Sequence, residues 1–159
     1  MEKSITVKRI FDAEHQDVWK LWSESENVMK WWGPDHFTCP LARLDFREGG
    51  VSLVAMKYPK EMGEQTSYCI WFYTIIIPFK RIEYRQNLSD KNGLKQNPVS
   101  LDMPPDFPVD VRTVVEFNPL ESEKTEVIMT EYADFGQMTH FAILGLEQCM
   151  DKARLILMN

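Results

Sequence analysis

The chain has 159 residues, of which 44% are hydrophobic and 12% aromatic, and this is enough apolar material for one compact core. A formal net charge of -6, without a dense cluster of lysines and arginines, argues against nucleic acid or an anionic membrane surface as a partner. The 3 cysteines are widely separated and form no C-x-x-C motif, so they fit a reducing compartment and indicate neither a zinc site nor a disulfide framework.

The beginning of the chain predicts a strand followed by two short helices. Residues 4–11 alternate between apolar and polar side chains at a period of two, as in a half-buried strand. Apolar residues then recur at helical spacing over residues 14–22. A second short helix is expected from Ser23 to the Trp31-Trp32-Gly33-Pro34 corner, where the Gly-Pro pair ends it.

The longest apolar run, residues 68–78, is much shorter than the ~20 residues that a membrane-spanning helix needs. It is rich in β-branched and aromatic residues, which favours a buried strand. The residues before the first strand also lack the apolar stretch of a signal peptide. We therefore expect a cytoplasmic protein that does not bind a membrane.

The middle of the chain predicts an antiparallel sheet with one dry face and one wet face. Between residues 109 and 117, Val115 and Phe117 fall on one side of the strand, whereas Arg112 and Glu116 fall on the other. Most connections are short enough to join antiparallel neighbours. The expected strands after the two helices cover residues 39–46, 51–58, 66–77, 81–88, 109–117 and 125–132.

Residues 89–109 interrupt this pattern with prolines and polar residues that leave little room for regular structure. Loops of this length are uncommon in compact domains, and those that occur are often lids or mobile segments. Two readings therefore stay open for this Pro-rich insertion, namely a lid and a disordered surface loop. In either case, we expect residues 1–159 to form a single domain.

The last part of the chain, from residue 136 onward, predicts a long helix. Met138, Phe141, Gly145 and Cys149 lie along one apolar stripe at ~100° per residue. The middle of this stripe has small side chains, and it therefore either lets the sheet approach closely or leaves a space between helix and sheet. A helix that faces a curved sheet through small residues is one way to build a cavity.

Several motifs occur in an order that resembles the SRPBCC (START-like) superfamily, and within it the branch named after the C-terminal domain of the activator of the large heat-shock chaperone ATPase. The resemblance runs nearly end to end, and the Pro-rich insertion departs from it. The motifs are Val18-Trp19-x-x-Trp22, Trp31-Trp32-Gly33-Pro34, Phe37 and Asp45-x-Arg47-x-Gly49-Gly50.

The resemblance implies an α+β helix-grip fold, in which a curved antiparallel sheet wraps around the long C-terminal helix and two short helices follow the first strand. It also implies an apolar cavity between the sheet and that helix. Function follows less directly, because members of this superfamily include lipid and hormone binders, polyketide cyclases and chaperone regulators.

The expected cavity would be lined by large apolar side chains together with the small residues of the last helix. Core packing explains the same aromatic residues equally well, because aromatic content does not separate a filled core from an empty one. The candidate lining residues are Trp31, Trp32, Phe37, Phe72, Val115, Phe117, Met138, Phe141, Gly145 and Cys149.

Candidates for catalysis are few. His36 follows the Trp-Trp corner, which we expect near the cavity mouth, although a surface histidine is the simpler reading. Glu131 would act as a proton carrier if it faced inward, because burial raises the pKa of a carboxyl group, but buried carboxyl groups are often merely paired. The spacing of His15, His36 and His140 predicts no metal site, and no motif predicts a cofactor.

These observations favour a non-enzymatic module that binds a small apolar or amphipathic molecule between the sheet and the last helix. Two alternatives stay open. One is a protein-interaction module that docks a chaperone or another protein, and the other is a cyclase-like or hydrolase-like enzyme that uses the same cavity. Both a monomer and a homodimer are compatible with the sequence.

Overall fold

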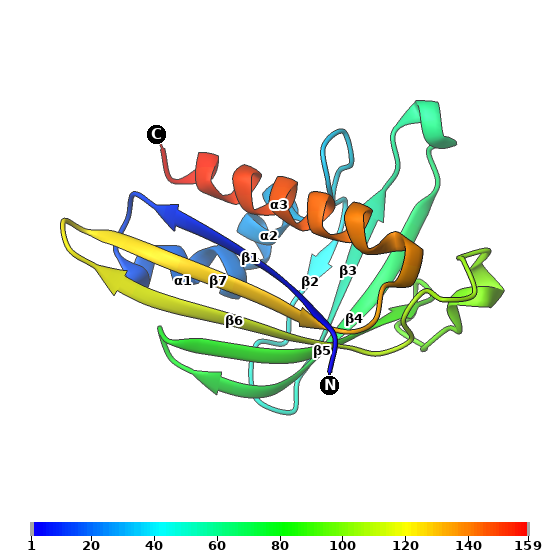
Figure 1. The fold of residues 1–159 in the computed structure, drawn as a ribbon, viewed down its shortest axis with the longest axis horizontal. Coiled ribbons are helices and arrows are strands. Elements are labelled where there is room, and N and C mark those ends of the chain that lie inside the picture. Colours follow the sequence, from blue (N-terminus) through cyan, green and yellow to red (C-terminus); the bar gives the residue numbers. More distant parts are fainter. Residues whose placement is uncertain (1, 159) are drawn as a thin grey trace.

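The computed structural model describes residues 2–158, and within them seven strands form one antiparallel sheet that curves around α3 (Thr139–Ile156) (Figure 1). Their order across the sheet is β1-β7-β6-β5-β4-β3-β2. The strands are β1 (Ser4–Phe11), β2 (Ala42–Arg43), β3 (Val51–Lys57), β4 (Thr66–Ile77), β5 (Arg81–Ser89), β6 (Val111–Leu120) and β7 (Lys124–Tyr132). The expected α+β helix-grip fold is confirmed.

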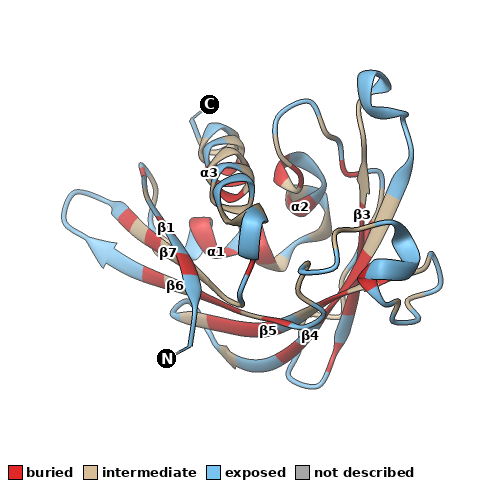
Figure 2. Ribbon diagram, turned by 45° about the vertical axis from the view of Figure 1, so that its right-hand side comes forward, coloured by how far each residue is buried: buried red, intermediate tan, exposed pale blue. Residues whose placement is uncertain are grey.

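Two short helices, α1 (His15–Ser23) and α2 (Ser25–Trp31), connect β1 to β2. They lie on the same concave side of the sheet as α3, as Figure 2 shows in an oblique view. Because β1 pairs with β7, the first strand and the last strand are neighbours, and α3 then passes back across the sheet. This arrangement places α3 over the concave face and leaves the opposite face of the sheet uncovered by helices.

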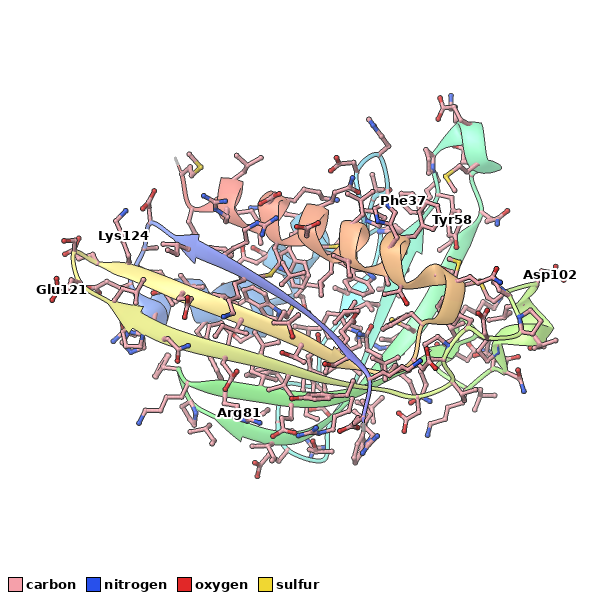
Figure 3. All side chains as sticks on the ribbon, in the orientation of Figure 1. Phe37, Tyr58, Arg81, Asp102, Glu121 and Lys124 are labelled. Atoms are coloured by element: carbon pink, nitrogen blue, oxygen red, sulfur yellow. The ribbon has the colours of Figure 1, made fainter. Side chains whose placement is uncertain are left out.

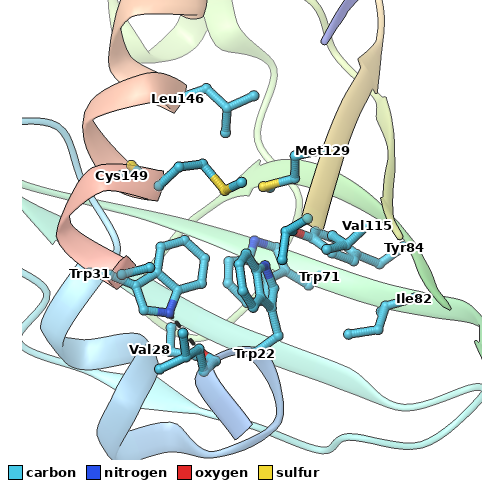
Figure 4. Close-up of a cluster of buried hydrophobic side chains, with 14 of the residues drawn as sticks. Trp22, Val28, Trp31, Trp71, Ile82, Tyr84, Val115, Met129, Leu146 and Cys149 are labelled. Carbon is cyan, nitrogen blue, oxygen red and sulfur yellow. Dashed lines mark hydrogen bonds between the residues drawn. The ribbon is translucent and has the colours of Figure 1, made fainter. Parts of the chain in front are cut away.

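The dense part of the core lies where α1 and α2 meet the sheet (Figure 4). Trp22 and Trp31 are fully buried, with ring centroids 5.1 Å apart, and Trp22 packs edge-on against Phe117 at 5.4 Å. The Trp31 indole N–H donates a 2.7 Å hydrogen bond to the carbonyl oxygen of Leu21. Since burial of a large apolar side chain stabilises a fold by about 1.5–3 kcal/mol, these indoles fix both helices on the sheet.

A lysine on α3 holds the corner that follows α2. Lys152 Nζ lies 2.8 Å from the carbonyl oxygen of Gly33, 3.4 Å from that of Phe37 and 3.5 Å from that of Pro34. Gly33 has a φ of 108°, a value that glycine adopts without strain. The corner is therefore tied to α3 through main-chain oxygens, whose positions depend little on side-chain identity.

Several strand boundaries differ from expectation, and β6 continues past the expected end at residue 117 to Leu120. In the segment 39–46, only Ala42–Arg43 pairs with β3. Pro40 has no N–H for a sheet, and the chain turns so tightly afterwards that a Cβ atom at Gly50 would overlap the carbonyl oxygen of Asp45. The strand expected from Val109 begins at residue 111 instead, because Asn87 Nδ2 donates to the Val109 carbonyl at 2.8 Å, and the Val109 side chain is exposed.

The last helix is also shorter than expected. A 3₁₀ turn, η3 (Gly136–Met138), precedes α3, so the α-helix begins at Thr139. Gly136 has a φ of 53°, and a Cβ atom there would overlap the Asp106 carboxylate. The start of α3 thus meets the Pro-rich insertion at very close range.

Candidate functional site

A cavity of about 840 Å³ lies between α3, the inner face of the sheet around β3, β4 and β5, and the Pro-rich insertion. This volume falls within the range of roughly 300–1,000 Å³ that is typical of small-molecule pockets. It lies away from the dense cluster of Trp22, Trp31 and Phe117, which do not line it. On the concave side of the sheet, the tryptophan cluster therefore fills one end, and the cavity occupies the other.

The start of α3 forms one wall of the cavity. Met138, Phe141, Ala142, Gly145, Leu146 and Cys149 line it. Their spacing of three and four residues puts them on one helix face. Ala142 and Gly145 leave room for the cavity because their side chains are small. A Cβ atom at Gly145 would touch only Pro34, at an ordinary distance of 3.9 Å.

The Pro-rich insertion forms a second wall. After β5, Asp90 accepts hydrogen bonds from the N–H groups of Asn92 and Leu94 at 2.8 and 3.0 Å, and a short 3₁₀ helix, η2 (Pro98–Leu101), follows. Asp106 Oδ2 accepts a 3.1 Å hydrogen bond from the N–H of Gln137, at the start of α3. The insertion contributes Leu101, Met103, Phe107 and Pro108 to the cavity lining.

The cavity wall carries one polar network, centred on Gln86 of β5. Gln86 Nε2 donates to Glu131 Oε2 at 2.9 Å and to Thr113 Oγ1 at 3.2 Å, while its Oε1 accepts from Trp71 Nε1 at 3.2 Å. The Cys69 thiol lies 3.8 Å from the same Oε1 atom. Because indole nitrogen is only a donor, Trp71 fixes which end of the Gln86 amide faces Glu131.

Glu131 borders the cavity, so part of its side chain is accessible, but protein atoms surround it closely. Burial raises the pKa of Glu131 to about 7, and the hydrogen bond from Gln86 offsets part of that rise because it favours the ionised form. Burial also raises the pKa of the Cys69 and Cys149 thiols to about 12, so both thiols are neutral at physiological pH.

Two buried polar atoms among residues 2–158 lack a hydrogen-bond partner, namely Trp22 Nε1 and the Tyr84 hydroxyl. The Tyr84 ring packs at 5.0 Å from Trp71, below the polar network. Burial, and after it the charge of Glu131, raise the pKa of Tyr84 well above its ordinary value. Glu131 thus has an unpaired hydroxyl as its neighbour and no cation.

Half of the residues expected at the cavity do line it, namely Trp32, Met138, Phe141, Gly145 and Cys149. Trp31, Val115 and Phe117 instead belong to the fully packed core. Their expected role at the cavity is wrong because the side chains of α1 and α2, among them Trp31 itself, pack against Val115 and Phe117 and leave no space there.

The positions of Phe72 and Phe37 also differ from expectation, because neither residue lines the cavity. Trp71 and Tyr73 face inward, and strand alternation therefore turns Phe72 to the outer face, where 41% of it is exposed. Phe37 does not line the cavity but lies 4.9 Å, ring to ring, from Tyr58, which does (Figure 3). Of the two candidate proton carriers, Glu131 lines the cavity, whereas His36 is exposed outside it with a φ of 73°.

Sequence reasoning missed Gln86, although a signal was present. Ile82, Tyr84, Gln86 and Leu88 alternate along β5 on the inner face, so one amide interrupts an apolar series. No sequence pattern indicated that the Pro-rich insertion lines the cavity, because its contacts depend on how the loop folds back onto the start of α3.

A family model described as "Activator of Hsp90 ATPase homolog 1-like protein" matches residues 12–155. The chain belongs to this family. Membership in the family confirms the resemblance seen in the tryptophan and glycine motifs. A search of curated proteins found no match.

Solved structures of similar fold agree with this assignment. A protein from Arthrobacter aurescens has 19% identity and a TM-score of 0.79, over 97% of this chain and 85% of that chain. A protein from Chromobacterium violaceum has 19% identity and a TM-score of 0.76, over 98% and 97%. The AHSA1 protein from Silicibacter pomeroyi has 14% identity and a TM-score of 0.75, also over 98% and 97%. At these identities, the likeness shows the shared fold.

None of the helices within residues 2–158 is both long enough and apolar enough to cross a membrane. In the same part of the chain, no group of three or more His, Cys, Asp or Glu side chains is arranged to hold a metal ion.

Proposed function

We propose that this member of the Hsp90 ATPase activator-like family binds a small apolar or amphipathic molecule in the cavity beneath the start of α3. The observation that carries the proposal is the cavity of about 840 Å³, whose walls are mostly apolar and include the polar network around Gln86. Apolar walls with a few placed polar groups are typical of small-molecule sites.

The driving force would be the burial of apolar ligand surface, worth about 25 cal/mol per Å² before the cost of ordering the ligand. Met103 and Met138 both line the cavity, and their flexible thioethers adapt to ligands of different shape. Aromatic rings on the insertion and on α3, such as those of Phe107 and Phe141, offer flat apolar surfaces at the cavity.

Binding of a neutral apolar dye such as Nile red tests the proposal. We expect saturable fluorescence enhancement with one dye molecule per chain. Ala142 lines the cavity, so Ala142→Phe should fill part of it and weaken binding about tenfold, in line with the loss of apolar contact area. Leu144→Phe adds an aromatic ring to the exposed side of the same helix and is the matched control.

Equal dye affinity in the Ala142→Phe variant and the wild-type protein would contradict the cavity as the binding site. Loss of binding in the Leu144→Phe variant would do the same, because that residue does not border the cavity. Thermal unfolding of each variant shows whether the fold is intact.

A second candidate function is docking onto a chaperone, which the description of the family model suggests. The observation that favours it is a row of exposed apolar residues on the outer face of β3 and β4. Val51 and Phe72 are register partners, 46% and 41% exposed, and Ile75 and Ile77 continue the row at 36% and 44%. Exposed apolar patches of this kind often mark protein contacts.

The ATPase rate of an Hsp90-type chaperone, measured with and without this protein, tests the docking function. We expect Phe72→Ser to reduce any stimulation, since it removes the largest apolar side chain of the row. Ile10→Ser, which removes an exposed apolar side chain from β1, is the control. An ATPase rate that does not respond to a large excess of the protein would exclude this role.

A further inference from the structure

We infer that Glu131 is the anchor for the protonated nitrogen of an amphipathic amine, which would occupy the cavity with its polar end at β7 and its apolar body toward the insertion and α3. This inference rests on the proposed function, because it names the chemical class of the ligand for the same cavity.

Glu131 has unused capacity to accept hydrogen bonds. A carboxylate offers about four lone-pair directions to donors. Within residues 2–158, Glu131 accepts one side-chain hydrogen bond, from Gln86 to Oε2 at 2.9 Å. Gln86 itself has no donor left, because its second N–H bonds Thr113. The remaining acceptor positions of Glu131 therefore need donors that the described chain does not supply, and the residue borders the cavity.

The charges of the cavity lining also favour a cationic ligand. Among the residues that line the cavity, only Glu131, Asp90 and Lys91 carry a formal charge. Lys91 is an exposed residue of the insertion, and Asp90 is occupied by the N–H groups of Asn92 and Leu94. The inner part of the cavity thus holds a carboxylate without a cation. A half-buried carboxylate favours a cation nearby and disfavours a second anion, so carboxylic acids and phosphates are poor candidates for this position.

The cavity that Glu131 borders also has an indole in its wall. Trp32 lines the cavity and packs edge-on against Trp71 at 5.3 Å. Trp71 in turn donates to the same Gln86 amide that binds Glu131. Indole faces attract cations as well as apolar groups. A cavity that holds both a carboxylate and an indole therefore suits an alkylammonium group better than it suits a neutral hydroxyl group.

Octylamine, octanol and octanoate are a matched series for the test, because they share one alkyl chain and differ in the polar end. At about pH 8, displacement of Nile red should rank octylamine above octanol, and octanol above octanoate. We expect octylamine to bind about tenfold more tightly than octanol, as a charge-assisted hydrogen bond implies.

Glu131→Gln removes the charge and keeps the shape of the side chain. In this variant, octylamine affinity should fall about tenfold, to the level of octanol, whose own affinity should change little. Glu126→Gln is the matched control, since it removes a carboxylate from the outer face of the same strand. Thermal unfolding of both variants separates misfolding from loss of the anchor.

The pH dependence gives a second readout. Octylamine should bind about fivefold more tightly at about pH 8 than at about pH 6, because its advantage of about tenfold over octanol requires the ionised form of Glu131. The other titratable groups that face Glu131 are Tyr84 of β5, Cys69 of β4 and Cys149 of α3, and all three stay neutral over this range. Its neighbours on β1 and β6, Ile5 and Thr113, do not titrate. Octanol affinity should be independent of pH.

The outcomes separate the two proposals. If neither Nile red nor any member of the octyl series binds, the proposed function itself fails. If the dye binds but octanol or octanoate binds as tightly as octylamine, or if Glu131→Gln leaves octylamine affinity unchanged, the amine anchor is wrong and the apolar cavity stands.

Discussion

The ammonium group of Lys152 lies 2.8 Å from the carbonyl oxygen of Gly33, across the contact between α3 and the corner that ends α2. The same corner carries Trp32 and Pro34, which line the cavity. One side chain of α3 therefore holds in place a part of the cavity wall that is more than a hundred residues away in the sequence.

Lys152→Met should destabilise the protein by about 1–2 kcal/mol, because a charged hydrogen-bond donor is lost while the apolar stem is kept. Urea unfolding measures the change. Lys30→Met, at an exposed position of α2, is the control and should change stability by less than about 0.5 kcal/mol. Equal effects of the two substitutions would mean that the contact with the Gly33 carbonyl contributes nothing.

Glu131→Gln should stabilise the protein at high pH and have little effect at low pH. Burial raises the pKa of Glu131 from 4.5 to about 7, so between these values the folded chain keeps a proton that the unfolded chain has lost. Stability from this group is therefore present below about pH 4.5 and is lost as the pH rises through about 7. The variant should gain up to about 3 kcal/mol over wild type at about pH 8.

Urea unfolding at about pH 5 and about pH 8 gives this comparison directly. Glu126→Gln, on the outer face of the same strand, is the matched control. A Glu131→Gln difference that is equal at both pH values would show that Glu131 is ionised throughout.

Gly136→Ala should destabilise the protein by about 2 kcal/mol or more, since alanine is strained at positive φ and its Cβ would overlap the Asp106 carboxylate. Asp106→Ala alone should cost about 1 kcal/mol, through loss of the hydrogen bond to the Gln137 N–H. Because Asp106→Ala also removes the overlap, the double variant should be more stable than the sum of the single effects predicts. Strict additivity would show that the two residues do not meet in solution.

Gly145→Ala should stabilise the protein, in contrast to Gly136→Ala. The added methyl group meets only Pro34 at 3.9 Å, and Gly145 lies inside α3, where alanine is the better helix former. We expect a gain of about 0.5–1 kcal/mol in thermal or urea unfolding. A loss of stability would indicate that α3 lies closer to the corner than the 3.9 Å separation allows.

Strand and helix positions were largely predictable from the sequence, because period-two alternation and the stripe on α3 reflect burial directly. The boundaries at Val109 and over residues 39–46 were not, since a side-chain hydrogen bond from Asn87 and the close approach at Gly50 decide them. The outward position of Phe72 was predictable, because side chains alternate along β4 and the neighbouring Trp71 and Tyr73 face inward.

The site was less predictable than the fold. The stripe of Met138, Phe141, Gly145 and Cys149 was found because it has helical spacing. Which aromatic residues fill the core and which border the cavity depends instead on where α1 and α2 pack, so Val115 and Phe117 could not be told apart from true lining residues. The pairing of Gln86 with Glu131 joins residues 45 positions apart and has no local pattern.

The Pro-rich insertion leaves the sheet at the end of β5 and returns at the start of β6, and Asp106 joins it to the turn that precedes α3. Its length and sequence can thus change without a shift in strand register or a disturbance of the tryptophan cluster. Homologues could therefore differ in this one loop and recognise different molecules, while the sheet and the helices fold in the same way.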